Sequence, residues 1–206
     1  MDIERGLVKT AYGYIHYRAA GAGGAAGGEA IVLLHMNQQS SAVYLELIAE
    51  LAPHLRVVAI DYPSHGDSDH VDKQPSIGDY AQCAVAVADA LGIAKFSALG
   101  EAAGAAVAID LAVSHAARVN KIVLVNCPYY KDRNMAESRH GPLKSGLRPE
   151  DASGFPGTRT IEFLLSKDPG HAPMNPTQSW MDRINTAQME CGRHRWQALE
   201  IGRAHV

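Results

Sequence analysis

Hydrophobic residues in this chain form short continuous runs that alternate with longer segments of helical spacing. Four runs are short enough to be strands buried on both faces, and they lie at residues 30–35, 55–61, 95–99 and 121–126. Three segments carry apolar residues three and four positions apart, at residues 40–52, 76–91 and 102–115. Strands that alternate with helices in this way predict a mostly parallel sheet with helices on both faces.

Polar residues mark where two of these helices begin. Ser40 or Ser41 is placed to cap the first helix, which we expect to end at Pro53. Ser76 and Asp79 have the spacing of a capping box, in which each residue bonds the backbone N–H of the other. The second helix is therefore predicted to begin directly after Ser76.

The pattern also predicts a hairpin and the burial of two elements. Alternating stretches at residues 7–10 and 12–19 predict an N-terminal hairpin, and the Gly/Ala tract at 21–28 predicts a loop to the next strand. The segment 102–115 is apolar nearly all round, so we expect other elements to cover it. The run at 121–126 is expected to be a further strand of the buried type. Because a seventh strand would normally flank it, we also expect it to form an exposed apolar edge in the chain as given.

A turn of unusual composition follows the run at residues 95–99. The residues Gly100-Glu101-Ala102-Ala103-Gly104 would join a strand to a helix by a sharp turn, in which small residues let the backbones pass closely. Alanine has no oxygen, sulfur or carboxylate that could attack a carbonyl carbon. The sequence therefore predicts the frame of a nucleophile elbow with no nucleophile at its centre.

Two further motifs precede this turn in order. One strand closes in His35-Met36-Asn37, and the next closes in Asp61-Tyr62-Pro63-Ser64-His65-Gly66-Asp67-Ser68. Together the three motifs resemble the α/β-hydrolase superfamily over about residues 8–126. The chain departs from the family pattern at three positions: Met36 and Ser64 stand in place of glycines, and Ala102 stands in place of the nucleophile.

The resemblance implies the α/β-hydrolase fold with a site at the carboxyl ends of the strands. Position 102 would be that of the nucleophile, and the backbone N–H groups of Asn37 and Ala103 would bind the oxygen of a carbonyl group. In that family His35 and His65 are scaffold residues, so we expect them to make structural hydrogen bonds. The residues expected to line the pocket are His35, Met36, Asp61, Glu101, Asn126 and Cys127.

From residue 128 onward the composition shifts to charged segments punctuated by Pro and Gly. Helices are expected at residues 159–166 and 177–200, and in the superfamily an insertion at this place is a helical cap over the pocket. The family's acid and histidine follow later strands, so we expect the fold to be truncated before them. We do not expect His140, His171 or His194 to act as a base instead, because a base must be oriented by a rigid scaffold. The last residues resemble the translation of a sequencing adapter. The expected division is a six-stranded core at 1–127, a cap segment at 128–199 and a non-native tail at 200–206.

Composition narrows the class of protein further. The chain has 206 residues, of which 47% are hydrophobic and 20% charged, and this is ordinary usage for one globular domain. A formal net charge of −3 without a basic run argues against a nucleic-acid partner and favours a small-molecule ligand. Charges interrupt the longest apolar stretch, and the N-terminus lacks the features of a signal peptide, so a cytoplasmic protein with no membrane contact is expected.

The three cysteines are far apart, so they indicate neither a disulfide framework nor a metal site, and no cofactor is expected. Cys127 is expected to be a buried apolar thiol.

Three functions remain open at this point. The first is a hydrolase of a small ester or other carbonyl substrate, inactive as written because Ala102 replaces the nucleophile. The second is a non-catalytic relative that keeps the pocket and binds a small molecule. The third is an enzyme in which Glu101 or a loop residue activates water directly, because a carboxylate in a poorly solvated cleft can act as a base. Ser97 is not expected to substitute as nucleophile, because it lies within a strand.

Overall fold

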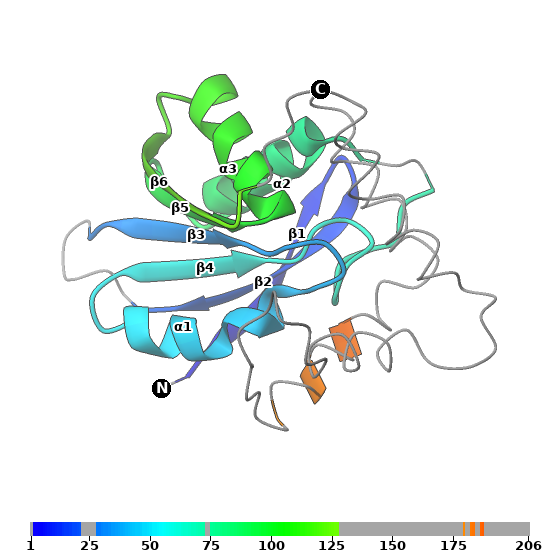
Figure 1. Cartoon of the computed structure of the whole chain (residues 1–206), viewed down its shortest axis with the longest axis horizontal. Helices are drawn as coiled ribbons and strands as arrows, with labels where there is room; N and C mark the ends of the chain where they lie inside the picture. Colours follow the sequence, from blue (N-terminus) through cyan, green and yellow to red (C-terminus); the bar gives the residue numbers. More distant parts are fainter. Residues whose placement is uncertain are drawn as a thin grey trace, which may run out of the picture.

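A computed structural model of the chain describes residues 2–21, 28–72 and 75–127, together with Ser179, Asp182, Arg183, Thr186 and Ala187. Six strands in the described part form one sheet in the order β1-β2-β4-β3-β5-β6 (Figure 1). Their bounds are β1 Glu4–Thr10, β2 Gly13–Ala20, β3 Ala30–Leu34, β4 Arg56–Ile60, β5 Phe96–Glu101 and β6 Val119–Val125. The predicted hairpin is confirmed as β1–β2, although β1 begins three residues earlier than the pattern indicated.

The sheet is parallel except at its hairpin edge. Strands β4, β3, β5 and β6 pair in parallel, whereas β2 is antiparallel to both β1 and β4. The carboxyl ends of the four parallel strands therefore meet at one edge of the sheet. That edge carries the three sequence motifs, because each motif follows one of these strands.

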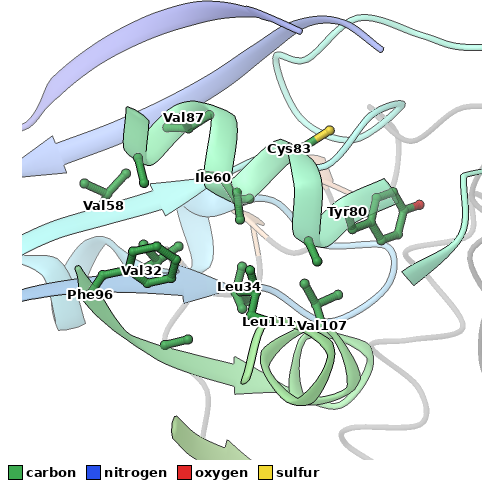
Figure 2. Packing of buried hydrophobic residues seen from close by; sticks show 14 of the residues in the cluster. Val32, Leu34, Val58, Ile60, Tyr80, Cys83, Val87, Phe96, Val107 and Leu111 are labelled. Atoms are coloured by element: carbon green, nitrogen blue, oxygen red, sulfur yellow. The ribbon is translucent and has the colours of Figure 1, made fainter. Parts of the chain in front are cut away.

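Helices cover both faces of the sheet, as the alternation of elements predicts. Helices α2 (Ile77–Ala90) and α3 (Ala103–Ser114) lie on one face, and helix α1 (Leu45–Leu51) lies on the other (Figure 1). Figure 2 shows the larger core, in which Val32 and Ile60 of the strands meet Val87 of α2 and Leu111 of α3. A second cluster packs Ile48 of α1 against the opposite face.

The two predicted helix starts have different outcomes. At Ser76 the capping box is confirmed, because Asp79 N–H donates to the Ser76 hydroxyl at 3.2 Å and Ser76 N–H donates to the Asp79 carboxylate at 2.7 Å. At Ser40 the prediction of a side-chain cap is wrong. The chain passes first through a 3₁₀ turn, η1 (Ser41–Tyr44), and the hydroxyl of Ser40 makes no capping hydrogen bond.

Burial of β6 and α3 is incomplete. β6 is the edge strand of the described sheet, and Ile122 to Val125 are 36 to 46% exposed, so the expectation of a buried strand is wrong and that of an exposed apolar edge is confirmed. Helix α3 is covered on one side only, since Val113 is 76% exposed and Ile109 is 39% exposed. Hydrophobicity predicted these elements correctly, but burial depends on which neighbours are present.

Several expectations concern residues outside the described part of the chain. They are the Gly/Ala tract at 22–27, the helix at 159–166, the tail at 200–206, and all but five residues of the expected cap at 128–199. Among the described residues, no helix has both the length and the apolar character needed to cross a membrane.

Candidate active site

The turn between β5 and α3 has a strained backbone at its centre. Ala102 has φ 50° and ψ −110°, a conformation that residues with a side chain rarely adopt. Its N–H donates to the Val125 carbonyl at 3.0 Å, which ties the turn to the end of β6. Position 102 is thus held at the edge of the sheet by backbone contacts rather than by its own side chain.

Two glycines make this turn possible because backbone fills the space where a side chain would stand. A Cβ atom at Gly100 would lie 2.0 Å from the Gly104 carbonyl oxygen. A Cβ atom at Gly104 would lie 2.0 Å from the Leu34 oxygen and 2.9 Å from the His35 oxygen. The start of α3 therefore packs directly against the end of β3.

The amino end of α3 offers hydrogen-bond donors at this place. The first N–H groups of a helix have no partner within it, and Ala105 N–H already donates to the Ala102 carbonyl at 3.0 Å. The N–H groups of Ala103 and Gly104 precede it, at the positive end of the helix dipole. This arrangement favours an oxygen atom that carries negative charge.

The loop after β3 brings Asn37 to the same edge. His35 is fully buried; its Nδ1–H donates to the Met36 carbonyl at 2.7 Å, and its Nε2 accepts from Tyr62 N–H at 3.3 Å. Both ring nitrogens are used, and burial lowers the pKa of His35, so the ring is a neutral structural group. Gln38, next to Asn37, has a left-handed φ of 62°, which turns the chain toward η1.

Asp61 at the end of β4 is a buried carboxylate surrounded by donors. It accepts hydrogen bonds from Nδ1–H of His16 at 2.8 Å, from Asp67 N–H at 3.0 Å and from Ser41 N–H. Burial alone would raise the pKa of Asp61, but the bond from His16 and the other donors outweigh it and lower the pKa to about 2. Asp61 is therefore charged and fully hydrogen-bonded, so it lies at the edge as a structural group.

Glu101 has the opposite environment. It is the last residue of β5, next to position 102, and its side chain is neither fully buried nor exposed. Desolvation raises the pKa of Glu101, and the hydrogen bond from the Asn126 side chain lowers it only in part. Asn126 follows β6 with a left-handed φ of 49°. Glu101 and Asn126, both expected to line the pocket, thus contact one another beside the turn.

Of the remaining expected site residues, His65 is buried, whereas Met36 and Cys127 are exposed to solvent. His65 is buried, its Nδ1 lies 3.0 Å from the Pro63 carbonyl oxygen, and burial together with His35 lowers its pKa to about 3. Met36 is 36% exposed. Cys127 is exposed, so the expectation of a buried thiol there is wrong.

His16 is a site-linked residue that sequence reasoning missed. It lies in β2, and it is buried between Asp61 and the guanidinium of Arg5, whose Nε–H donates to His16 Nε2 at 3.2 Å. The only signal in the sequence is a histidine within an apolar strand, which has no motif spacing.

One atom each of His16, Asp61 and Asp67 lie within 4.8 Å of one another, as in a metal site. However, Arg5 pairs with Asp67 and three donors occupy Asp61, so the contacts fit a hydrogen-bonded network better than a cation.

Comparisons with known proteins agree with this arrangement. The sequence profile described as "Alpha/beta hydrolase family" matches residues 31–203. The chain is 35% identical over 142 residues to a pimeloyl-[acyl-carrier protein] methyl ester esterase of Pectobacterium carotovorum, which covers 68% of this chain and 53% of the relative. It is 28% identical over 120 residues to a "Putative non-heme haloperoxidase" of Mycobacterium phage D29, covering 58% of this chain and 41% of the relative.

A solved structure extends the likeness of fold. The enol-lactonase from Burkholderia xenovorans LB400 superposes with a TM-score of 0.75 at 18% identity, covering 97% of this chain and 74% of that one. The chain spans about half or less of the length of the two curated relatives, at 53% and 41%.

Proposed function

Because this chain belongs to the alpha/beta hydrolase family, we propose that the edge around Ala102 is a site for a small ester or lactone, with position 102 as the nucleophile position. The observation that carries the proposal is the backbone of Ala102, at φ 50° and ψ −110°, between two glycines at which a Cβ atom would lie 2.0 Å from a backbone oxygen. Such strain persists only where the surrounding structure enforces it, and it occurs mainly at functional sites.

At this edge the backbone can bind a carbonyl oxygen, but the side chain at position 102 cannot attack the carbonyl carbon. The N–H groups of Ala103 and Asn37 would donate to the carbonyl oxygen of the ligand and would stabilise negative charge that develops on it. With alanine at position 102, the chain has no atom there to form an acyl intermediate. The chain with Ala102 would thus bind the carbonyl compound without cleaving it through an acyl intermediate. The alternative proposal is therefore a non-catalytic protein that binds such a compound.

The relatives support the class of ligand. The 35% identical relative is named as a methyl ester esterase, and the fold is shared with an enol-lactonase. Esters and lactones both present a carbonyl carbon with an oxygen leaving group, so one pair of oxyanion donors serves both. A small-molecule partner is the common element of these proposals.

A second candidate rests on Glu101. Its partly buried carboxylate has a raised pKa and lies next to position 102, and these are the properties of a base that activates water. In this candidate Glu101 would take a proton from water while the water oxygen attacks the carbonyl carbon. The ester C–O bond would then break, and the proton held by Glu101 would pass to the leaving alkoxide, which restores the carboxylate. Turnover would then need no side chain at position 102.

Hydrolysis of p-nitrophenyl butyrate by matched variants tests the proposal. Removing the nucleophile of a serine hydrolase lowers kcat by about six orders of magnitude, so the unaltered chain and Ala102→Gly are expected to show no turnover above buffer. Ala102→Ser in this chain restores the attacking oxygen but not a histidine to take its proton, so it is also expected to give no burst. In a chain extended with the later strands that carry the family's acid and histidine, Ala102→Ser has both groups and is expected to release a burst of p-nitrophenolate of about one equivalent per chain.

The controls separate the two candidates. Ser97→Ala in the extended Ala102→Ser background is expected to keep the burst, because Ser97 lies within β5. No burst from the folded, extended Ala102→Ser variant would contradict the hydrolase proposal. Turnover by the unaltered chain that disappears in Glu101→Gln would replace it with the second candidate.

A further inference from the structure

We propose that Asp61 is a positioning residue for the loop that carries Asn37, and that His16 holds the Asp61 carboxylate in place. This loop comprises residues 35–41. The inference rests on the proposed function, because the loop matters to the site only if the Asn37 N–H binds a ligand oxygen.

Asp61 holds the far end of the loop. Its carboxylate accepts the N–H of Ser41, the first residue of η1, although the two residues are twenty positions apart in the sequence. Both groups are fully buried, at 0% exposure. A bond from a buried N–H to a carboxylate is among the stronger hydrogen bonds in proteins, so it fixes where the loop ends.

The residue after Asp61 holds the near end. Tyr62 N–H donates to His35 Nε2 at 3.3 Å, and the same ring donates through Nδ1 to the Met36 carbonyl at 2.7 Å. Both ends of the loop are therefore attached to the consecutive residues Asp61 and Tyr62. Asn37 lies between these two attachments, so we expect its position relative to the start of α3 to depend on both of them.

His16 and the turn after β4 determine the orientation of the Asp61 carboxylate. His16 Nδ1–H donates to Oδ2 at 2.8 Å, and Asp67 N–H donates to the same oxygen at 3.0 Å. Gly66 packs against that oxygen so closely that a Cβ atom there would lie 2.3 Å from it. With Oδ2 held by these groups, Oδ1 is directed to Ser41 N–H. His16 therefore acts on the loop through Asp61, from the distant strand β2.

Amide hydrogen exchange in ¹⁵N-labelled chain tests this directly. The readout is the exchange rate of Gln39 N–H, bonded within the loop, relative to Ala105 N–H, bonded within the elbow. In Asp61→Asn, which keeps the shape of the side chain but loses its charge, the Gln39 to Ala105 ratio is expected to rise about ten-fold. An unchanged ratio would overturn the proposal.

A second variant keeps the test decisive if Asp61→Asn does not fold. Ser41→Pro removes the loop N–H that bonds the Asp61 carboxylate, at the first position of a helical turn, where proline is tolerated. The preceding residue Ser40 has φ −141° and ψ 173°, the extended conformation that proline requires before it. The same rise in the ratio is expected. The matched control is Asp67→Asn, which alters the exposed carboxylate of the network and is expected to leave the ratio unchanged.

Titration with butyrate separates this inference from the proposed function. In the unaltered chain the ¹⁵N–¹H signals of Asn37 and Ala103 are both expected to shift, and in Asp61→Asn the Asn37 shift is expected to fall while the Ala103 shift remains. Equal responses of the two amides in Asp61→Asn would overturn the inference. If neither amide shifts in the unaltered chain, the proposed function is contradicted, and the exchange ratio still decides whether Asp61 positions the loop.

Discussion

Two turns meet at the carboxyl edge of the sheet, and they keep their shape by opposite means. The turn after β4 is held by side chains, since Asp61 accepts three N–H donors and Ser68 Oγ donates to the Asp61 carbonyl at 2.8 Å. The turn after β5 is held by the absence of side chains, because Gly100 and Gly104 let backbone contact backbone. The first turn uses its polar groups internally, whereas the second leaves N–H groups for a ligand.

Two carboxylates at this edge show the same difference. Asp61 is fully buried with a lowered pKa, and Glu101 is less buried with a raised pKa. Burial disfavours charge in both, so the number of donors decides the sign of the shift. The lowered pKa of Asp61 therefore accompanies a structural role, whereas the raised pKa of Glu101 leaves its carboxylate available to accept a proton.

The largest effect is expected where backbone fills the space of a side chain. Gly104→Ala would place a methyl group 2.0 Å from the Leu34 oxygen, so the elbow must open or the chain must unfold. We expect a loss of about 4 kcal/mol or more in the free energy of unfolding, measured by urea denaturation. Gly92→Ala is the control, because its φ of 68° costs about 1 to 2 kcal/mol but its surroundings are open. Equal losses would contradict the close packing of α3 on β3.

Removing the Asp61 side chain should have the next largest effect. Asp61→Ala leaves three donors without an acceptor, two of them buried, and we expect the free energy of unfolding to fall by about 3 kcal/mol. Asp67→Ala should cost less than about 1 kcal/mol, because its pair with Arg5 is exposed to solvent. Chemical denaturation of both variants under identical conditions gives the comparison. A larger loss in Asp67→Ala would show that the exposed pairs, rather than Asp61, hold the turn.

Lowering the pH should change the free energy of unfolding in opposite directions through the two carboxylates, Asp61 and Glu101. The pKa of Asp61 falls from 3.8 to about 2 on folding, so its contribution of about 2 kcal/mol is present above pH 4 and is lost as pH falls toward 2. The raised pKa of Glu101 acts in the opposite direction, because its charged form is disfavoured in the fold and protonation relieves that cost. Denaturation midpoints between pH 2 and 7 should fall less steeply at the acid end for Asp61→Asn than for the unaltered chain. Glu101→Gln should be more stable than the unaltered chain at pH 7 and lose this advantage in acid.

The smallest effect concerns the strain at position 102. Glycine adopts φ 50° and ψ −110° without steric cost, so Ala102→Gly should raise the free energy of unfolding by about 1 kcal/mol, after the greater entropy of the unfolded chain is subtracted. Ala103→Gly, one residue into α3, should lower it by a similar amount. Thermal denaturation of the pair measures both. A loss of stability in Ala102→Gly would mean that the backbone there is not strained.

The sequence predicted the features that depend on neighbours along the chain. The apolar runs, the hairpin and the capping box at Ser76 all depend on local spacing, and the ordered motifs predicted that Asn37, Asp61 and Ala102 lie at the carboxyl ends of strands. Features that depend on distant partners were missed. The role of His16 needs β2 to lie beside β4, and the exposure of Cys127 depends on what covers the end of an edge strand. A periodic pattern contains neither kind of information.

The site at which a serine-directed phosphonate reacts tests most directly whether position 102 is the nucleophile position. In a chain extended with the later strands that carry the family's acid and histidine, Ala102→Ser has a hydroxyl and a base for its proton. A fluorophosphonate ester should then lose fluoride and form one adduct, and peptide mass spectrometry should place it on residue 102. The same extended chain with Ala102 in place should form none. An adduct on Ser97 or another native serine, or no adduct in the folded, extended Ala102→Ser variant, would contradict this assignment.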